Sequence, residues 1–141
     1  MKLPDLNVLL YAINEESPHH GKARSWLEHA LGGSEPVALD WQVLVGFIRI
    51  STHKSILPRP LTIEQALLFV DEALHAPSAQ LTHPTDRHAL LVGRLLLGAG
   101  KAGNLANDAH LAALAIEHDA TLVSFDHDFR RFAGLRLELL E

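Results

Sequence analysis

The sequence contains no cysteine and no hydrophobic run long enough to cross a membrane. Without cysteine there is neither a disulfide framework nor a thiolate metal site, which is compatible with a reducing cytoplasm. The longest apolar stretch, residues 89–99, includes Arg94 and is shorter than a membrane-spanning helix requires. Asp5, Glu15 and Glu16 interrupt the first residues, where a secretory signal would be apolar. We therefore expect a cytoplasmic protein without a membrane segment.

The sequence is also poor in positive charge. It has 12 Lys and Arg against 17 Asp and Glu, which gives a net charge of −5 with neutral histidines. This balance argues against a protein that coats nucleic acid by bulk electrostatics. It does not exclude a nuclease, because a bound metal ion would neutralise part of an acidic cluster.

Several common cofactor motifs are absent. The 10 histidines include no HExxH motif and no pair with the spacing of a zinc finger, and there is no Walker loop or GxGxxG. His110, His118 and His127 are therefore expected to be solvated or to cap helices. The glycine-rich tract at residues 98–103 follows a predicted helix rather than a strand, so we interpret it as a connector.

Short apolar runs alternate with amphipathic segments, and 141 residues fit a single domain spanning residues 1–141. Thr62, with Gln65 three residues later, predicts a capping box at the start of one helix. Strands are predicted at 1–5, 36–39, 79–82, 121–124 and 135–139, and helices at 6–12, 20–31, 41–51, 62–75, from 85 to the glycines at 98–100, and 104–118. This order predicts an α/β fold with a mostly parallel central sheet covered by helices on both faces.

Five aspartates follow predicted strands or begin a predicted helix, namely Asp5, Asp40, Asp108, Asp126 and Asp128. Ligands of open α/β sheets bind outside the carboxyl ends of the strands, so such a fold would gather these acids. Two carboxylates about 5 Å apart repel by roughly 3 kcal/mol at an effective dielectric of ~20. Protonation or cations must offset that repulsion, and hard divalent ions such as Mg²⁺ or Mn²⁺ suit oxygen ligands.

Asp108 lies on the apolar stripe of its predicted helix. Leu111, Ala112 and Ala115 follow it at three, four and seven residues, which places all four side chains on one face. A helix N-terminal acid favoured by the macrodipole is the structural alternative. An acid on a buried stripe is seldom left without a partner, so we favour a functional role.

The strand at 121–124 ends in Ser124, Phe125 and Asp126, with Asp128 two residues later. Ser124 and Asp126 lie on one side of the chain, where the hydroxyl could hydrogen-bond a phosphate or a metal-bound water. The alternative is a polar turn in which Asp128 caps the next short helix. We expect Asp126 to be functional, and Asp128 less so.

Asp5 and Asp40 each have a simple structural explanation as well. Asp5 could serve as the N-cap of the helix that begins at Leu6, and a functional role is about equally supported. Asp40 could be the N-cap of the helix that begins at Trp41, and that role is slightly favoured.

Three segments in this order and spacing carry a specific pattern, namely 4–12 (PDLNVLLYA), 104–115 (NLANDAHLAALA) and 120–129 (ATLVSFDHDF). Together they resemble the PIN-domain ribonucleases, specifically the VapC-type toxins of prokaryotic toxin–antitoxin modules. The resemblance covers essentially the whole chain. It implies a PIN-like three-layer α/β/α fold with a mostly parallel central sheet.

The resemblance implies that Asp5, Asp108 and Asp126 are metal-binding catalytic acids, with Ser124 as a supporting group and Asp128 as an auxiliary acid. The family usually also has a glutamate on the helix after the second strand.

Gly46 is the best match to that glutamate in this chain. Either the site works with fewer acids, or Asp40 takes the place of the glutamate as a further auxiliary acid.

The expected activity is therefore a Mg²⁺- or Mn²⁺-dependent endoribonuclease that hydrolyses RNA phosphodiester bonds. The resemblance also implies a cognate antitoxin, which would lay a hydrophobic segment on this chain, and a homodimer. Candidates for a basic rim that receives RNA are Lys22, Arg24, Arg49, Arg130 and Arg131.

Two other function classes remain open at this point. A metal-dependent phosphatase or phosphotransferase would use Asp5 as its nucleophile, but position 7 is Asn7, where a second acid is typical. A non-catalytic binding module would have no reason to keep an acid on the buried stripe at Asp108.

Overall fold

The computed structural model describes residues 1–141, and its centre is a five-stranded sheet with the strand order β3-β2-β1-β4-β5. Every neighbouring pair of strands is parallel. The strands are β1 (Lys2–Pro4), β2 (Val37–Leu39), β3 (Ala79–Leu81), β4 (Thr121–Ser124) and β5 (Arg136–Leu139). The predicted mostly parallel α/β sheet is thus confirmed.

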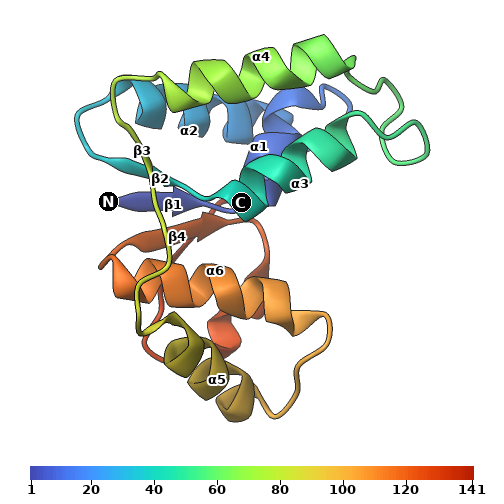
Figure 1. The fold of residues 1–141 in the computed structure, drawn as a ribbon. Coiled ribbons are helices and arrows are strands. Elements are labelled where there is room, and N and C mark those ends of the chain that lie inside the picture. The colour runs from blue at the N-terminus through green and yellow to red at the C-terminus, as the bar shows by residue number, and fades with distance from the viewer.

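Helices cover both faces of the sheet. They are α1 (Leu6–Ile13), α2 (His20–Gly32), α3 (Trp41–Ser51), α4 (Ile63–Leu74), α5 (His88–Ala99) and α6 (Leu105–Glu117), with a short 3₁₀ helix η1 (His127–Arg131) between β4 and β5. Figure 1 shows α1 to α4 on one side of the sheet and α5 and α6 on the other. This is the three-layer arrangement that the sequence predicts.

The hydrophobic core runs through all three layers. Residues 37–39 of β2 and 122–124 of β4 are fully buried, as expected for central parallel strands covered on both faces. A cluster of 29 buried hydrophobic residues joins these strands to the helices. None of the helices combines the length and hydropathy needed to cross a lipid bilayer.

The order of the strands creates a switch point between β1 and β4. From β1 the chain moves to β2 and β3 on one side of the sheet, and it then returns to β4 and β5 on the other side. Lys2 pairs with Thr121 and Pro4 with Val123. The backbone N–H of Asp5 donates to the Val123 carbonyl over 2.8 Å, so β1 and β4 end side by side. Ligand sites of open α/β sheets lie at such a point.

N-cap side chains fix the starts of two α-helices, α1 at Asp5 and α4 at Thr62. At α4, the Thr62 hydroxyl accepts from the Gln65 backbone N–H over 3.1 Å, and the Gln65 side chain accepts from the Thr62 N–H over 2.9 Å, which confirms the capping box. The predicted start of the fifth helix at Thr85 is wrong, because α5 begins at His88. Thr85 instead forms a turn in which its hydroxyl accepts from the Arg87 N–H over 3.2 Å.

Candidate active site

Asp5 lies directly after β1 and caps α1. One of its oxygens, Oδ1, accepts from the Leu6 backbone N–H over 2.7 Å, and Oδ2 accepts from the Ser124 hydroxyl over 2.7 Å. The predicted capping role is thus confirmed, while the same carboxylate faces the end of β4. Burial raises the pKa of Asp5, the hydrogen bonds from Ser124 and Leu6 counter part of this shift, and the charge of Asp126 raises it further.

Ser124 is fully buried at the end of β4 and joins the two strand ends. Its hydroxyl donates to Asp5 and accepts from the Asp126 backbone N–H over 2.9 Å and from the Asn7 amide over 3.1 Å. A hydroxyl has one proton and two lone pairs, so these three bonds use its whole capacity. Ser124 therefore positions Asp5, and it has no hydrogen bond left for a phosphate.

Asn7 is a member of this network that the sequence reasoning did not assign to the site. Its side-chain oxygen accepts from the Phe125 backbone N–H over 3.2 Å, while its amide donates to Ser124. It holds the segment after β4 against the first turn of α1. Its position two residues after Asp5 is the feature of the sequence that could have identified it as part of the site.

Asp126 follows β4 and serves as the N-cap of η1, because its Oδ1 accepts from the Asp128 N–H over 2.8 Å. The alternative in which Asp128 caps this helix is wrong, since Asp128 lies inside η1. The Asp128 side chain is exposed and lies 3.7 Å from the Arg131 guanidinium.

Asp108 reaches the same region from the first turn of α6, across from the strand ends. The structure gives its carboxylate no hydrogen bond. Partial burial, together with the charges of Asp5, Asp126 and Asp128, raises its pKa to about 6, and Arg131 counters only part of the shift. The charged form of Asp108 is thus disfavoured first by burial and then by the like charges of the cluster.

The residues of the cluster fit a hard cation by chemistry but are not arranged as a closed metal cage. All donors are carboxylate oxygens, and Asp108 is unpartnered, which suits Mg²⁺ or Mn²⁺. No three acidic or histidine side chains lie close enough together to ligate one ion directly. Magnesium usually keeps several of its waters, so an ion here would be held partly through water.

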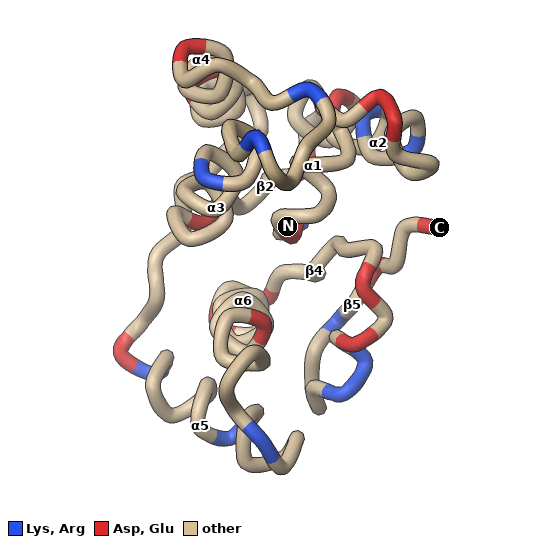
Figure 2. Tube along the Cα trace, turned by 90° about the vertical axis from the view of Figure 1, so that its right-hand side faces the viewer, with Lys and Arg blue, Asp and Glu red and all other residues tan.

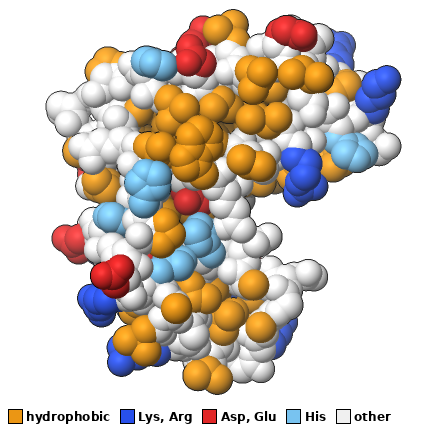
Figure 3. All heavy atoms as spheres, in the orientation of Figure 1, with side chains coloured by type: hydrophobic (Ala, Val, Ile, Leu, Met, Phe, Trp, Pro, Cys, Tyr) orange, Lys and Arg blue, Asp and Glu red, His pale blue; other side chains and the backbone are white.

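A cavity of about 610 Å³ opens beside Asp5 and Asp108, between α3 and α6. Its wall on α3 includes Trp41, Val45 and Gly46. The volume lies within the roughly 300–1,000 Å³ typical of ligand pockets. Figure 3 shows the surface hollowed between these two helices, with hydrophobic side chains gathered over α3 and α4.

Asp108 also borders a second hollow, of about 390 Å³, that contains two cationic side chains. Lys101 comes from the connection between α5 and α6, and Arg131 comes from η1. Figure 2 shows acidic positions of α6 and of the segment after β4 facing one another, with basic positions farther out on the α5–α6 connection. The glycine-rich connector predicted at residues 98–103 thus brings Lys101 to the site. Arg131, a predicted rim residue, lies there too.

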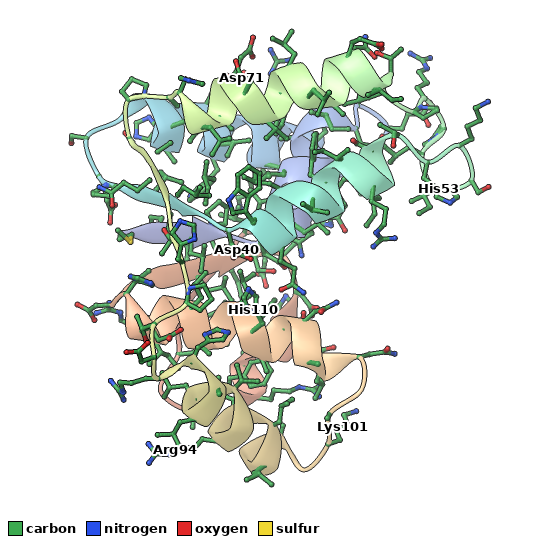
Figure 4. The ribbon with its side chains drawn as sticks, in the orientation of Figure 1. Asp40, His53, Asp71, Arg94, Lys101 and His110 are labelled. Atoms are coloured by element: carbon green, nitrogen blue, oxygen red, sulfur yellow. The ribbon has the colours of Figure 1, made fainter.

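Asp40 is not brought into this cluster. It occupies the N-cap position of α3, but its side chain makes no capping hydrogen bond. Its Oδ2 lies 3.1 Å from Nε2 of His110, and Figure 4 shows the two side chains pointing toward one another. Asp40 lines a separate hollow with His110 and His83. A replacement of the missing glutamate by Asp40 remains a prediction.

Asp40 and His110 begin a chain of four polar side chains that the sequence reasoning did not identify. His110 Nδ1 lies 2.9 Å from His88 Nε2, and His88 Nδ1 lies 2.5 Å from Glu117 Oε2. Burial acts to raise the pKa of Glu117, but hydrogen bonds from Thr85 and His88 outweigh it, so the pKa falls below its usual value. The expectation that His110 is solvated or a cap is wrong.

Gly46 lies in the cavity wall at the position that matches the glutamate of the family. A Cβ atom at this position would lie 3.0 Å from the Leu6 side chain, so a larger residue fits only if that leucine moves by a few tenths of an ångström. The Leu6 side chain therefore packs against Gly46, and both residues line the cavity.

Comparison with known proteins places this arrangement in a family. The sequence profile of the PIN domain matches residues 2–135. This chain belongs to the PIN domain family, which confirms the resemblance seen in the sequence.

Two relatives from Mycobacterium tuberculosis are named ribonuclease VapC37 and ribonuclease VapC33. They are 50% and 38% identical to this chain over 136 residues, which is 96% of this chain and 94% and 95% of theirs.

Solved structures share the fold over nearly the whole chain. VapBC2 from Rickettsia felis, bound to a DNA fragment from its promoter, matches with a TM-score of 0.72 and 26% identity over 99% of this chain and 98% of that chain. VapBC-1 from nontypeable Haemophilus influenzae has a TM-score of 0.67 at 16% identity over 98% and 96% of the two chains, and this likeness concerns the fold alone.

Proposed function

We propose that this protein is a Mg²⁺- or Mn²⁺-dependent endoribonuclease and the toxin of a type II toxin–antitoxin system. The structural observation that carries the proposal is the meeting of Asp5, Asp108 and Asp126 at the switch point of the sheet, where Asp108 has no partner and its pKa rises to about 6. Relatives named ribonucleases, at up to 50% identity, set the class of substrate.

The raised pKa of Asp108 is the reason to assign a functional role to this cluster and not a purely structural one. An acid held at a raised pKa destabilises the folded protein at neutral pH, and such groups concentrate at functional sites. Asp5, Asp108 and Asp126 would hold the cation, directly or through water. When bound, the ion supplies positive charge for the scissile phosphate and lowers the pKa of a water molecule.

The other residues position these acids and receive the substrate. Ser124 fixes the orientation of the Asp5 carboxylate, and Asn7 holds the segment that carries Asp126. Asp128 is an auxiliary acid, since its charge acts on Asp108 from the exposed side of η1. Lys101 and Arg131, on the outer side of Asp108, are placed to attract the RNA backbone. The reaction adds water at phosphorus and breaks one bond between phosphorus and a ribose oxygen.

The phosphatase alternative gains no support from the site. Asn7, at the position where such enzymes carry a second acid, is committed to Ser124 and to the Phe125 backbone.

The partners follow from the same proposal. The substrate is RNA, and a cognate antitoxin would cover the exposed hydrophobic side chains and place a basic side chain among the acids. VapBC2 from Rickettsia felis, a solved structure that is 26% identical to this chain, supports such a partner. A homodimer and a cytoplasmic location, where RNA is available, complete the proposal.

The test is RNA cleavage by the purified protein, with the ends sequenced to locate the cuts. Cleavage should stop in EDTA and return with Mg²⁺ or Mn²⁺, and Zn²⁺ should not substitute. Asp126→Asn, purified in parallel, controls for a contaminating nuclease. Undiminished cleavage in excess chelator, or rapid turnover of a phosphomonoester without RNA cleavage, would contradict the proposal.

A further inference from the structure

The cavity between α3 and α6 has features that neither the metal site nor the acids explain. Trp41 and Val45 lie one turn apart on α3 and both line it, although their side chains are 45% and 57% exposed. Trp41 is one of only two tryptophans in the chain. Its exposure beside the acidic cluster indicates a surface that contacts another molecule.

A polar edge faces this apolar wall. The Gln42 amide donates to the Asn107 side-chain oxygen over 2.7 Å, which links α3 to α6 across the cavity. This leaves the Gln42 oxygen as a free acceptor and the Asn107 amide as a free donor. A free acceptor on Gln42 and a free donor on Asn107 can pair with the edge of a nucleobase, and amide side chains read bases in this way.

Gly46 and Leu6 make this part of the cavity wall apolar. A Cβ at position 46 would lie 3.0 Å from the Leu6 side chain, so Leu6 packs directly against the glycine, and both residues line the cavity. Where the family usually carries an acid, this chain presents an uncharged surface next to the acidic cluster.

We infer that this cavity binds an unpaired nucleobase of the RNA strand next to the scissile phosphate, with Trp41 as the stacking surface and the Gln42–Asn107 pair as the reading edge. The inference rests on the proposed function, because Asp5 and Asp108 line the same cavity and place the phosphate beside it. Stacking tolerates any base, so Trp41 supplies affinity, and the amide pair supplies preference. Lys101 and Arg131 border Asp108 in the second hollow. The phosphate backbone of the RNA would continue there.

A fluorescence titration tests this inference without catalysis. Trp26→Phe leaves Trp41 as the only tryptophan, and a short single-stranded oligoribonucleotide is added in EDTA. Trp41 fluorescence should fall in a saturable way, whereas an abasic oligonucleotide of the same length should leave it unchanged. Trp41→Phe, which keeps only the half-buried Trp26 on α2, is the matched control and should show no quenching.

Cleavage kinetics give the second readout. Trp41→Ala should raise KM for RNA by roughly 5- to 150-fold with little change in kcat, the range expected for loss of one stacked base. Trp41→Phe should recover most of the affinity, and Leu97→Ala, which removes an exposed side chain on α5 away from the cavity, should change nothing. Gln42→Ala should alter which base is preferred beside the cut.

The outcomes separate this inference from the proposed function. Unquenched Trp41 fluorescence together with normal cleavage by Trp41→Ala would overturn the base site and leave the apolar wall as a surface for a protein partner. A wild-type protein that cleaves no RNA would defeat the proposed function, while the titration would still decide whether a base binds.

Discussion

Two groups of acids each include a residue of α6, Asp108 in one and Glu117 in the other, and they are partnered in opposite ways. Around Asp108, partial burial and then the like charges of the carboxylates that follow β1 and β4 raise its pKa to about 6. In the chain that starts at Asp40, each acid contacts a histidine, and the pKa of Glu117 falls. Asp108 and Glu117 belong to the same helix, so the partners of an acid, not its element, decide its electrostatic state.

The Asp108 carboxylate lacks a hydrogen-bond partner, whereas both acids of the chain from Asp40 to Glu117 already have one. The Asp40–His110–His88–Glu117 chain joins the start of α3 to α6 and α5, and each of its two acids lies within hydrogen-bond distance of a histidine. The Asp108 cluster is destabilising unless something positive binds to it. Breaking each group should therefore have opposite effects on activity and stability.

The largest effect is expected from the crowded cluster. Asp5→Asn, Asp108→Asn and Asp126→Asn should each lower RNA cleavage by about 100-fold or more, because each removes a charge that holds the cation. The fold should persist, since Asn keeps an oxygen for the caps at Asp5 and Asp126. Cleavage rates and thermal melts measure both, with Asp71→Asn, an exposed acid on α4, as the control. Full activity in one variant would remove that residue from the mechanism, and unfolding of all three would favour purely structural roles.

The partnered group should respond in stability instead. Asp40→Ser keeps a capping oxygen but removes the carboxylate that His110 contacts, and it should lower the free energy of unfolding by about 1–3 kcal/mol. The Mg²⁺ concentration for half-maximal cleavage should stay the same. His110→Gln and the double variant complete a cycle in which the two losses are less than additive.

Other results for Asp40→Ser would reassign the residue. Unchanged stability with an unchanged Mg²⁺ titration would reduce Asp40 to a replaceable cap. A normal fold that needs more Mg²⁺ would place Asp40 in the metal site, as a substitute for the missing glutamate.

A smaller effect concerns pH. The pKa of Asp108 is raised to about 6 from an ordinary 3.8, so the folded protein binds this proton more tightly than the unfolded chain does. In metal-free buffer, unfolding free energy should therefore rise as pH falls through about 6 and level off near 4. Allowing for solvent screening of this half-exposed group, we expect about 1 kcal/mol.

The matched measurement is the difference between wild type and Asp108→Asn, in which titration of the histidines cancels. The variant should lack most of the rise, and excess Mg²⁺ should suppress it in the wild type by favouring the ionised form. Parallel pH profiles of the unfolding free energy for the two proteins would show that folding does not raise the pKa of Asp108.

The smallest effect is expected from substitution of Gly46. Gly46→Glu would return a carboxylate to the crowded cluster, and Leu6 must shift because the new Cβ lies 3.0 Å from its side chain. Binding of Mn²⁺, measured by calorimetry, should tighten by a few-fold to about 10-fold. Gly46→Gln has the same shape without the charge and should not tighten it. Equal affinities in both variants would mean that position 46 does not reach the ion.

The sequence was sufficient for the fold because its signals are local. The capping box at Thr62, the apolar run of β2 and the stripe of α6 each depend on neighbouring residues, and each is found as predicted. The predicted start of α5 is wrong because the backbone N–H of Thr85 donates to Glu117, 32 residues away, and Thr85 forms a turn instead of a helix cap.

The candidate site was predictable only in part, for the same reason. The rule that strand ends meet at a switch point is enough to expect Asp5 near Asp126. It does not say which way a side chain turns, so Asp40 was expected either at the helix or at the metal, whereas it contacts His110. The pairing of His88 with His110 depends on how α5 packs on α6, and no spacing in the sequence reports that packing.

The pairing of β1 with β4 also has a consequence for synthesis of the protein. Lys2 pairs with Val37 of β2 on one side and with Thr121 of β4 on the other, so the second neighbour of β1 exists only when almost the entire chain has been made. Contacts between such distant residues form slowly, and domains fold as units while the ribosome proceeds from the N-terminus. Asp5 is made at the start, but Asp126 follows only near the end. The acidic cluster therefore cannot assemble until translation of the chain is nearly finished.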